Sequence, residues 1–521
     1  MNFKLLFASA IYIALLSVSC FADTFYVDAN NPAYFNNIQA AINDANDGDI
    51  IIVNPGRYIE HINTLGKAIT LQSTNPDDPQ IIACTIIDGN DSGTCITCNS
   101  HESENTLITG FLITDGNSIK GGGMYCTNHS SPTIKNCTFT NNKAERGGGV
   151  YCDNENNLLI TDCVFNFNEA IITTYGGYNH GGGAISCEYS SLQITNCSFN
   201  SNSALGKDNG LWNPCHSGYG GAVFLNNSTS AFSSCTFNGN YSYHSGGALY
   251  MGDYYSCPVV FSYCIFNNNT ARQAGGAVFG MFSKVENTIF NNNRALGGLD
   301  SMQIGNCGYG GAISGSADEI IECSFSGNTA KDDGGAISGG AMEMTNTTFA
   351  GNKAYCGGAI AGVAGQMNNC TLTANRSTNK GGAIYNSNDW VDSTVTNCTF
   401  NANVAYEGSA FYVDEDVSQN VINCTFHDNI SLKEIGIFNF PPNYLIGVIA
   451  TPDFSSNVVL GGSLLCSNLP NLIGTRYTDQ GGNVIADICP DIQPLKGDID
   501  SDGQVDTKDL QQLAQDWLNK N

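Results

Sequence analysis

The sequence predicts an all-β fold, a right-handed single-stranded parallel β-helix of about 14 coils. One unit recurs eleven times in phase between residues 121 and 429: a Gly pair, a small residue, an apolar residue, a variable stretch, and then Asn-Cys-x-Phe-x-x-Asn in its commonest form. Successive aromatic positions lie as few as 23 residues apart, as from Phe349 to Leu372. No unit has room for the ten or so helical residues of a crossover helix. The strands of one unit must therefore pair with equivalent strands of the next.

Residues 1–22 have the pattern of a secretory signal peptide. Lys4 precedes an apolar run over 5–16, and small residues follow. The run is too short to span a bilayer, and no later stretch reaches about 18 uninterrupted apolar residues. We expect cleavage after Ala22 and a secreted, extracellular or bacterial cell-surface location. The alternative is a lipoprotein signal, in which Cys20 carries a lipid anchor.

The composition excludes one class of partner. The chain contains 20 Lys and Arg against 47 Asp and Glu, a formal net charge of −27. Such a chain repels a phosphate backbone, so we expect no nucleic-acid partner.

A short helix is expected before the first coil. Ile38, Ala41, Ile42 and Ala45 have helical spacing, and Gly48 stops the helix. This helix covers the apolar open end of the solenoid. Apolar runs at 50–53, 68–71, 81–88 and 107–113 then form the first coils, and the predicted β-helix extends over residues 23–435. Irregular apolar runs over 436–490 predict a C-terminal cap.

Two side-chain columns follow from the repeat. Cysteine lies two residues before the aromatic position and shares its strand parity, so both point inward. We expect buried free thiols rather than disulfides or a metal-binding column, because side chains on neighbouring parallel strands point the same way. The Asn three residues after each aromatic position is expected in a tight turn with left-handed backbone angles, hydrogen-bonded to its neighbours. The cysteines are Cys137, Cys163, Cys197, Cys235, Cys264, Cys323, Cys370, Cys398 and Cys424, with Cys126, Cys152 and Cys187 in a second column.

Two segments resemble known β-helix families. The opening IQAAINDANDGDIIIVNPGRYIE resembles the first turns of pectate-lyase-like proteins. GGA followed by Ile, Val or Leu, alternating with Phe-x-x-Asn, resembles the repeat of chlamydial polymorphic outer membrane proteins. Together these resemblances cover about residues 24–430. They imply a β-helix fold without specifying an activity.

The C-terminal residues 496–521 predict a small EF-hand-like loop and helix that bind Ca²⁺. Carboxylates occupy positions 1, 3, 5, 9 and 12 of the loop, Gly503 allows the sharp turn at position 6, and Gln504 supplies a backbone carbonyl. The segment is similar to one half of a type I dockerin module, which implies a cohesin-like or sorting partner. The alternatives for a lone loop are docking on its own β-helix or on a second copy of the chain. The alternative is a solvated acidic tail. The predicted ligands are Asp498, Asp500, Asp502, Gln504, Asp506 and Asp509.

Three longer units predict a groove. Their insertions, 169–180, 203–219 and 294–309, all fall just before a Gly pair and would wall a groove beside the Gly-strands. On its floor, the residue four past the first Gly is expected to face outward, and it is aromatic in seven of eleven units. Such rings suit the apolar face of a sugar. The alternative is that the rings only stack on one another. The predicted polysaccharide-binding residues are Tyr125, Tyr151, Trp212, Phe224, Tyr250 and Phe279, and the remaining aromatics are Tyr385 and Tyr412.

The sequence contains no recognisable catalytic set. A lyase requires a cationic base, and only Arg272 and Lys207 lie near the groove; a hydrolase requires facing carboxylates. Asp153, Glu188, Asp253 and Asp414 flank the aromatic residues and could bind Ca²⁺ or sugar hydroxyls. The leading hypothesis is a non-catalytic adhesin or carbohydrate-binding rod, with a polysaccharide or cell-surface glycan as partner. The alternative is a polysaccharide lyase or glycoside hydrolase with Asp253 and Arg272 as catalytic candidates.

Overall fold

The computed structural model describes most of the chain between residues 22 and 486. The described segments are 22–154, 156–172, 180–206, 218–252, 258–298, 308–386, 393–413 and 418–432, followed by short strands between 449 and 486. The predicted signal peptide, apart from Ala22, and the predicted calcium loop at 496–521 lie outside the described residues. So do Trp212 and Asp253, two of the predicted site residues.

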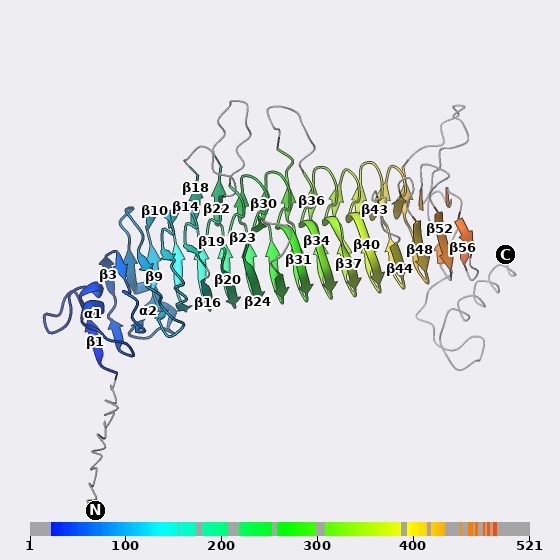
Figure 1. Cartoon of the computed structure of the whole chain (residues 1–521). Helices are drawn as coiled ribbons and strands as arrows, with labels where there is room; N and C mark the ends of the chain where they lie inside the picture. Colours follow the sequence, from blue (N-terminus) through cyan, green and yellow to red (C-terminus); the bar gives the residue numbers. More distant parts are fainter. Residues whose placement is uncertain are drawn as a thin grey trace, which may run out of the picture.

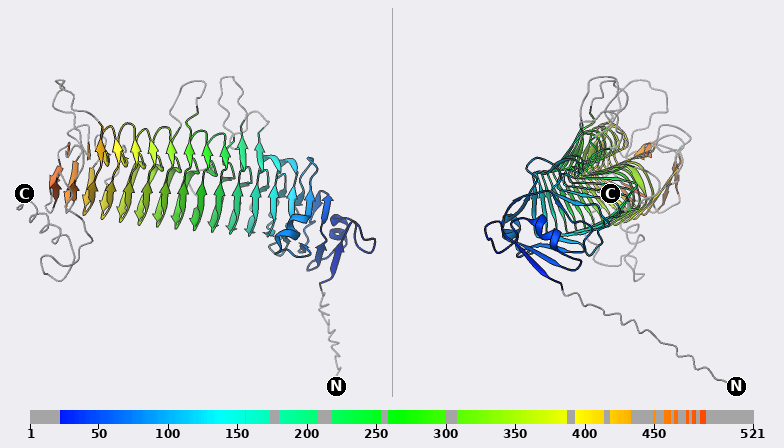
Figure 2. Two further views of the ribbon diagram at one scale, coloured as in Figure 1. Left: turned by 180° about the vertical axis from the view of Figure 1, so that it is seen from behind. Right: turned by 60° about the vertical axis from the view of Figure 1, so that its left-hand side comes forward.

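Three long parallel sheets run along one rod (Figures 1 and 2). Sheet A contains 28 strands, sheet B 16 and sheet C 12. A typical coil passes through two strands of sheet A, one of sheet B and one of sheet C, and then returns to sheet A beside its starting point. This is the parallel β-helix that the repeat predicts. One such coil consists of β11 (Met124–Cys126), β12 (Thr133–Lys135), β13 (Thr138–Thr140) and β14 (Lys143–Arg146), and β15 (Val150–Asp153) pairs with β11.

Sheet B contributes one strand to each coil, so its 16 strands correct the expected number of about 14 coils. The additional strands are β53 (Leu464–Cys466) and β56 (Val484–Ala486), beyond residue 435 (orange in Figure 1). Leu465 pairs with Phe426, and Ile485 pairs with Leu465. The short strands described within 436–490, the region predicted to be a cap, thus extend the parallel sheets. An apolar residue in register with the Phe column suffices for this, without the Asn-Cys signature.

Two short helices lie near the N-terminal end. α1 (Ile38–Asp44) forms where the apolar spacing predicts it, with Asn37 as its N-cap, and it packs against β1 (Thr24–Val27) and β2 (Ile50–Val53). α2 (Pro79–Cys84) corrects the strand expected over 81–88, because only β6 (Thr85–Asp88) is extended there. Asp78 caps α2, and Pro79 suits its first position. Neither helix is long and apolar enough to cross a membrane, and none other lies in the described segments.

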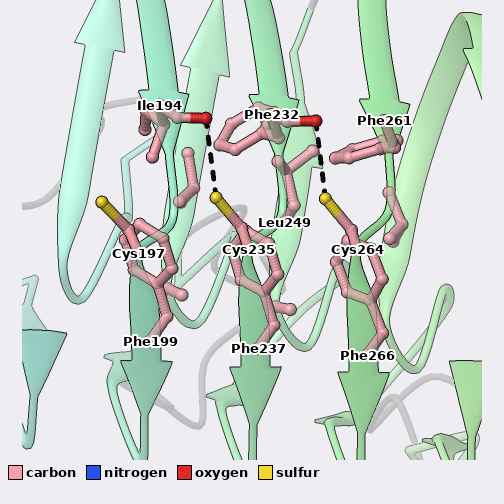
Figure 3. Close-up of a cluster of buried hydrophobic side chains, with 14 of the residues drawn as sticks. Ile194, Cys197, Phe199, Phe232, Cys235, Phe237, Leu249, Phe261, Cys264 and Phe266 are labelled. Carbon is pink, nitrogen blue, oxygen red and sulfur yellow. Dashed lines mark hydrogen bonds between the residues drawn. The ribbon is translucent and has the colours of Figure 1, made fainter. Parts of the chain in front are cut away.

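The interior of the rod is filled by stacked columns of identical side chains (Figure 3). The rings of Phe199, Phe237 and Phe266 stack with centroids 4.7 and 4.6 Å apart and planes within 4° of parallel. All nine cysteines of the first column are buried free thiols, as expected. Each donates to a carbonyl oxygen of the preceding coil, as Cys235 Sγ does to Ile194 O at 3.6 Å. Burial raises the pKa of Cys137 to about 12, which keeps this thiol protonated and unreactive.

The second cysteine column is also confirmed and is one residue longer than expected. Cys126, Cys152 and Cys187 pair in register on sheet A, and Cys98 precedes them. All four are buried free thiols.

The Asn of each repeat forms a continuous buried ladder. Asn269 shows the pattern: its side-chain amide donates to Asn293 Oδ1 at 3.0 Å and to the Phe237 carbonyl at 2.9 Å. Its Oδ1 accepts from the side chain of Asn240 at 2.9 Å and from the backbone N–H of Asn240 at 3.0 Å. The expected left-handed angle lies one residue earlier, at Asn268 with φ 54°, because the chain turns there and leaves the ladder side chain pointing inward.

The two glycines of each Gly pair are required for different reasons. The first Gly has a positive φ, 62° at Gly220. A Cβ on the second, Gly221, would lie 2.1 Å from the carbonyl oxygen of Gly247 in the next coil. Both positions therefore require Gly where the chain passes from sheet C to sheet A.

We predict that Asn269→Ala lowers the free energy of unfolding by about 2–4 kcal/mol, because it removes four hydrogen bonds and leaves buried partners unpaired. Chemical denaturation followed by circular dichroism measures this change. The matched control Asn238→Ala, at an exposed outward position, should change stability by no more than about 0.5 kcal/mol. Equal losses in both variants would contradict a stabilising ladder.

Candidate functional site

The seven aromatic residues of the Gly-strands lie in one column of sheet A, as the repeat predicts. They fall into three groups separated by small residues. The column runs from Tyr125 and Tyr151, through Ser186, to Phe224, Tyr250 and Phe279, and later to Tyr385 and Tyr412. Phe224 and Tyr250 belong to an apolar cluster separate from the main core, together with Tyr219. The column therefore lies on the outer side of the sheet.

The expectation that this column is exposed is wrong for four of its rings. Adjacent rings cover one another: Tyr250 and Phe279 stack with centroids 5.1 Å apart, and Tyr219 packs 4.2 Å from Tyr250. Stacking between rings thus accounts for the burial of Phe224 and Tyr250, whereas Tyr151 and Tyr412 are tilted against their neighbours. Tyr151, Phe224, Tyr250 and Tyr412 are buried, whereas Tyr125, Phe279 and Tyr385 are half-buried.

A lysine at the end of sheet C covers the first aromatic pair. Lys120, the last residue of β10 (Asn117–Lys120), places Nζ 4.7 Å from the ring centroid of Tyr151 and 5.7 Å from that of Tyr125. The same Nζ lies 2.9 Å from Asp153 Oδ2. The lysine therefore joins a ring and a carboxylate on the neighbouring coil.

An arginine one coil further along organises a second set of polar groups. Arg146 at the end of β14 lies 3.3 Å from Glu188 Oε1, and its Nη2 donates to His180 Nε2 at 2.7 Å. Arg146 also lowers the pKa of the Tyr151 hydroxyl, and Tyr151 in turn lowers the pKa of Glu188, so Tyr151 belongs to the same polar set. We call Lys120, Arg146, Tyr151, Asp153, His180 and Glu188 the corner cluster, because they lie where sheets C and A meet.

Burial sets the protonation behaviour of two members of the corner cluster. Burial raises the pKa of Tyr151 far above its ordinary value, and the charges of Glu188 and Asp153 raise it further, so the phenol stays protonated. Burial also raises the pKa of Glu188 above 4.5, against the opposing effects of Arg146 and Lys120. Glu188 is therefore the carboxyl group in this cluster that burial favours in its protonated form.

Two buried oxygens of this site have no hydrogen-bond partner among the described residues. They are Asp153 Oδ1 and Ser186 Oγ. Only 8% of Asp153 and none of Ser186 is exposed. Both atoms are shielded from solvent, and leaving such an oxygen unpaired costs about 1–3 kcal/mol.

The cluster brings together residues that no single strand contains. Asp153 and Glu188 are register partners on β15 and β19 (Ile185–Glu188), so their backbones lie about 4.8 Å apart. Sequence reasoning placed both carboxylates beside the aromatic column, and His180 in the insertion at 169–180 that walls the groove, but missed Lys120 and Arg146. The sequence contains a pattern that could have identified the two basic residues. Lys120 and Arg146 each directly precede a Gly pair, and a Tyr lies four residues after the first Gly of that pair. Lys380 repeats this pattern and lies 4.3 Å from the Tyr412 ring centroid.

The structure separates the catalytic candidate Arg272 from the corner cluster. Its guanidinium packs 4.5 Å from the ring centroid of Tyr243, four coils beyond Arg146. In the described part of the chain, no three His, Cys, Asp or Glu side chains are grouped to hold a metal ion. The predicted calcium ligands lie outside that part.

Comparisons with known proteins agree with this geometry. Residues 34–213 match the right-handed beta helix region family. The chain is a right-handed parallel β-helix. Four segments also match the Chlamydia polymorphic membrane protein repeat, so the chain carries repeats of that type, and the two matches together support a secreted or surface β-helical protein. The four segments are residues 234–251, 263–281, 322–340 and 369–387.

Whole-chain comparisons add little. No curated protein matches the sequence. Among solved structures, the chain is similar to the periplasmic alginate epimerase AlgG, with 10% sequence identity, coverage of 76% of this chain and 77% of that chain, and a TM-score of 0.22. A similarity at this level carries no function over.

We predict that Glu188 destabilises the fold increasingly as the pH rises. Because its pKa is raised in the folded state, the folded chain retains a proton that the unfolded chain has released. Its contribution is therefore most favourable below about pH 4.5 and declines through the folded pKa. The free energy of unfolding of the wild type, relative to Glu188→Gln, should fall between about pH 4 and about pH 7 in urea titrations. A flat or rising difference would contradict the prediction.

Proposed function

We propose that this protein is a non-catalytic carbohydrate-binding rod, an adhesin that is secreted or displayed on a cell surface. The observation that carries the proposal is the corner cluster, in which the partly exposed Lys120 lies over the half-buried ring of Tyr125, next to the partly exposed Arg146 of the following coil. Planar carboxylate and guanidinium groups bind pairs of sugar hydroxyls, and a ring beside them supports the apolar face of the sugar.

The charges of the cluster favour a hydroxyl-bearing ligand. Lys120 is paired with Asp153, and Arg146 is paired with Glu188, so the two cations and two carboxylates balance when all are ionised. A strongly charged ligand would have to break one of these pairs. A sugar hydroxyl can instead accept from the partly exposed N–H groups of Lys120 and Arg146 without separating the pairs.

The location is supported by the polymorphic membrane protein-type repeats and by the predicted signal peptide. The corner cluster takes its residues from strands β10, β14, β15 and β19, which lie along the length of the rod, so an extended polymer would be the matching ligand. In this proposal, the buried members of the aromatic column, together with their stacking partners, hold the sheet rigid beneath the site.

We predict that Asp153→Ala and Tyr125→Ala each weaken glycan binding by about tenfold, since each removes a charge-assisted hydrogen bond or a ring contact. A glycan array identifies the ligand, and titration calorimetry measures the affinity. The matched control is Tyr263→Ala, which removes a ring that is 62% exposed at a turn outside the site and should leave affinity unchanged. Equal weakening by all three variants, or no glycan binding by the wild type, would refute the proposal.

The alternative function is a glycoside hydrolase or lyase acting at the same corner. It is favoured by the juxtaposition of Asp153 and Glu188, one paired with Lys120 and the other favoured in its protonated form by burial. Depolymerisation assays on acidic and neutral glycans, with and without Ca²⁺, distinguish the two functions. Turnover that is lost in Glu188→Gln would replace the binding proposal with this one, whereas turnover that is lost only in Arg272→Ala or Asp253→Ala would indicate an enzyme that acts away from the corner cluster.

We also propose that residues 496–521 bind Ca²⁺ through the six predicted loop ligands and attach the rod to a cohesin-like or sorting partner. Five carboxylates at EF-hand spacing support this proposal.

We predict that calorimetric titration of the full chain with Ca²⁺ gives a binding signal that is lost in Asp502→Ala, because the substitution removes a carboxylate from position 5 of the loop. Asp428→Ala, at an exposed turn of the β-helix, serves as the control and should bind normally. An unchanged isotherm in Asp502→Ala would rule out the loop.

A further inference from the structure

A groove of about 310 Å³ lies on the second half of sheet A, far along the chain from the corner cluster. It crosses three neighbouring strands, β37 (Ile337–Thr345), β40 (Ile360–Asn368) and β44 (Ser393–Thr396). These strands lie in the green to yellow part of the rod in Figure 1. The volume is at the lower end of the range of about 300–1,000 Å³ that is typical of ligand sites.

Six of the eight side chains that line the groove form two columns across three coils, and Asn397 and Asn423 complete the lining. Glu343, Gln366 and Thr394 are register partners in the first column. Thr345, Asn368 and Thr396 form the second. Because neighbouring strands lie about 4.8 Å apart, the groove presents polar groups at a regular spacing along the rod.

The groove is held in shape by hydrogen bonds at its edge. Asn368 Oδ1 accepts from Thr396 Oγ1 at 3.1 Å and from Asn397 Nδ2 at 3.0 Å. Beneath it, Met344, Met367 and Val395 are buried in the core and fix the strands. The amide of Gln366 and the hydroxyl of Thr345 make no hydrogen bond to other described residues, so both are available to a ligand.

The chemistry of the lining selects the class of ligand. No lysine or arginine lines the groove, and Glu343 is its one carboxylate, in a chain of net charge −27. An anionic ligand is therefore repelled, and one carboxylate is too few for a Ca²⁺ site. An apolar ligand would leave the amides and hydroxyls unpaired. A neutral ligand rich in hydroxyl groups satisfies them.

We propose that this groove is a second binding site, for a neutral oligosaccharide that lies across β37, β40 and β44. It is separate in position and residues from the corner cluster and does not depend on it. The rod then holds two carbohydrate sites on the outer side of sheet A, and a polymer long enough to reach both is bound more tightly than either site alone allows.

The test is titration calorimetry of the full chain with neutral oligosaccharides derived from β-glucan, xylan, mannan and chitin, and with oligogalacturonate as the anionic probe. Gln366→Ala/Thr394→Ala should weaken neutral binding at the groove about tenfold or more and lower the stoichiometry by one site. Asp153→Ala should leave that site intact. Affinity at the groove should be the same in ~0.05 M and ~0.5 M NaCl, because the ligand carries no charge.

The matched control is Gln193→Ala/Thr195→Ala. These exposed residues of β20 (Ser191–Thr195) belong to the same two columns of sheet A but lie six coils from Gln366, outside the groove. The control should bind as the wild type does. The proposal is overturned if both double variants weaken binding equally, if neither does, if no neutral oligosaccharide binds, or if oligogalacturonate binds more tightly with a salt-dependent affinity.

Discussion

The buried asparagine ladder is the interaction on which the rest of the rod depends. The side-chain amide of a ladder Asn such as Asn269 donates to the ladder Asn of the following coil and to a backbone carbonyl of the preceding coil. Its side-chain oxygen accepts from the ladder Asn of the preceding coil. All eleven ladder Asn side chains are fully buried. Each can therefore form its hydrogen bonds only if the adjacent coils are in register. The same register aligns the Phe and Cys columns, since a shift by one residue would turn every inward side chain outward.

The requirement for register restricts the sequence more strongly at some parts of each coil than at others. The turn between sheets B and C is fixed by the ladder, and the corner between sheets C and A is fixed by the Gly pair, where backbone of successive coils approaches too closely for a Cβ. Side chains that follow these fixed corners take equivalent positions in every coil. Lys120 and Lys380 thus lie over tyrosine rings in the same way although they are 260 residues apart. Functional chemistry can vary only at outward positions and insertions.

Both proposed sites use that freedom. The corner cluster takes its residues from the ends of sheet C strands and from the neighbouring Gly-strands, so it spans several coils. The groove takes its residues from two outward columns of the second half of sheet A. Both rest on apolar side chains buried in the core, which gives them the rigidity that binding of a weakly interacting sugar requires. They differ in charge: the corner cluster is built from ion pairs, whereas the groove is almost uncharged.

The repeat by itself determined the coil, the inward Cys and Phe columns and the Asn ladder, because these depend on strand parity and on contacts between identical residues one period apart. The repeat did not predict the strands at 449–486, where the Asn-Cys-x-Phe-x-x-Asn pattern is absent. It also did not predict α2, which Asp78 and Pro79 specify locally. Parity indicated that Tyr151 and Phe224 lie on the outer side, but only the tertiary structure decided that neighbouring rings and Lys120 bury them. The corner cluster and the groove were likewise decided by the stacking of coils, since Asp153 meets Glu188, and Gln366 meets Thr394, only across a register that no single strand contains.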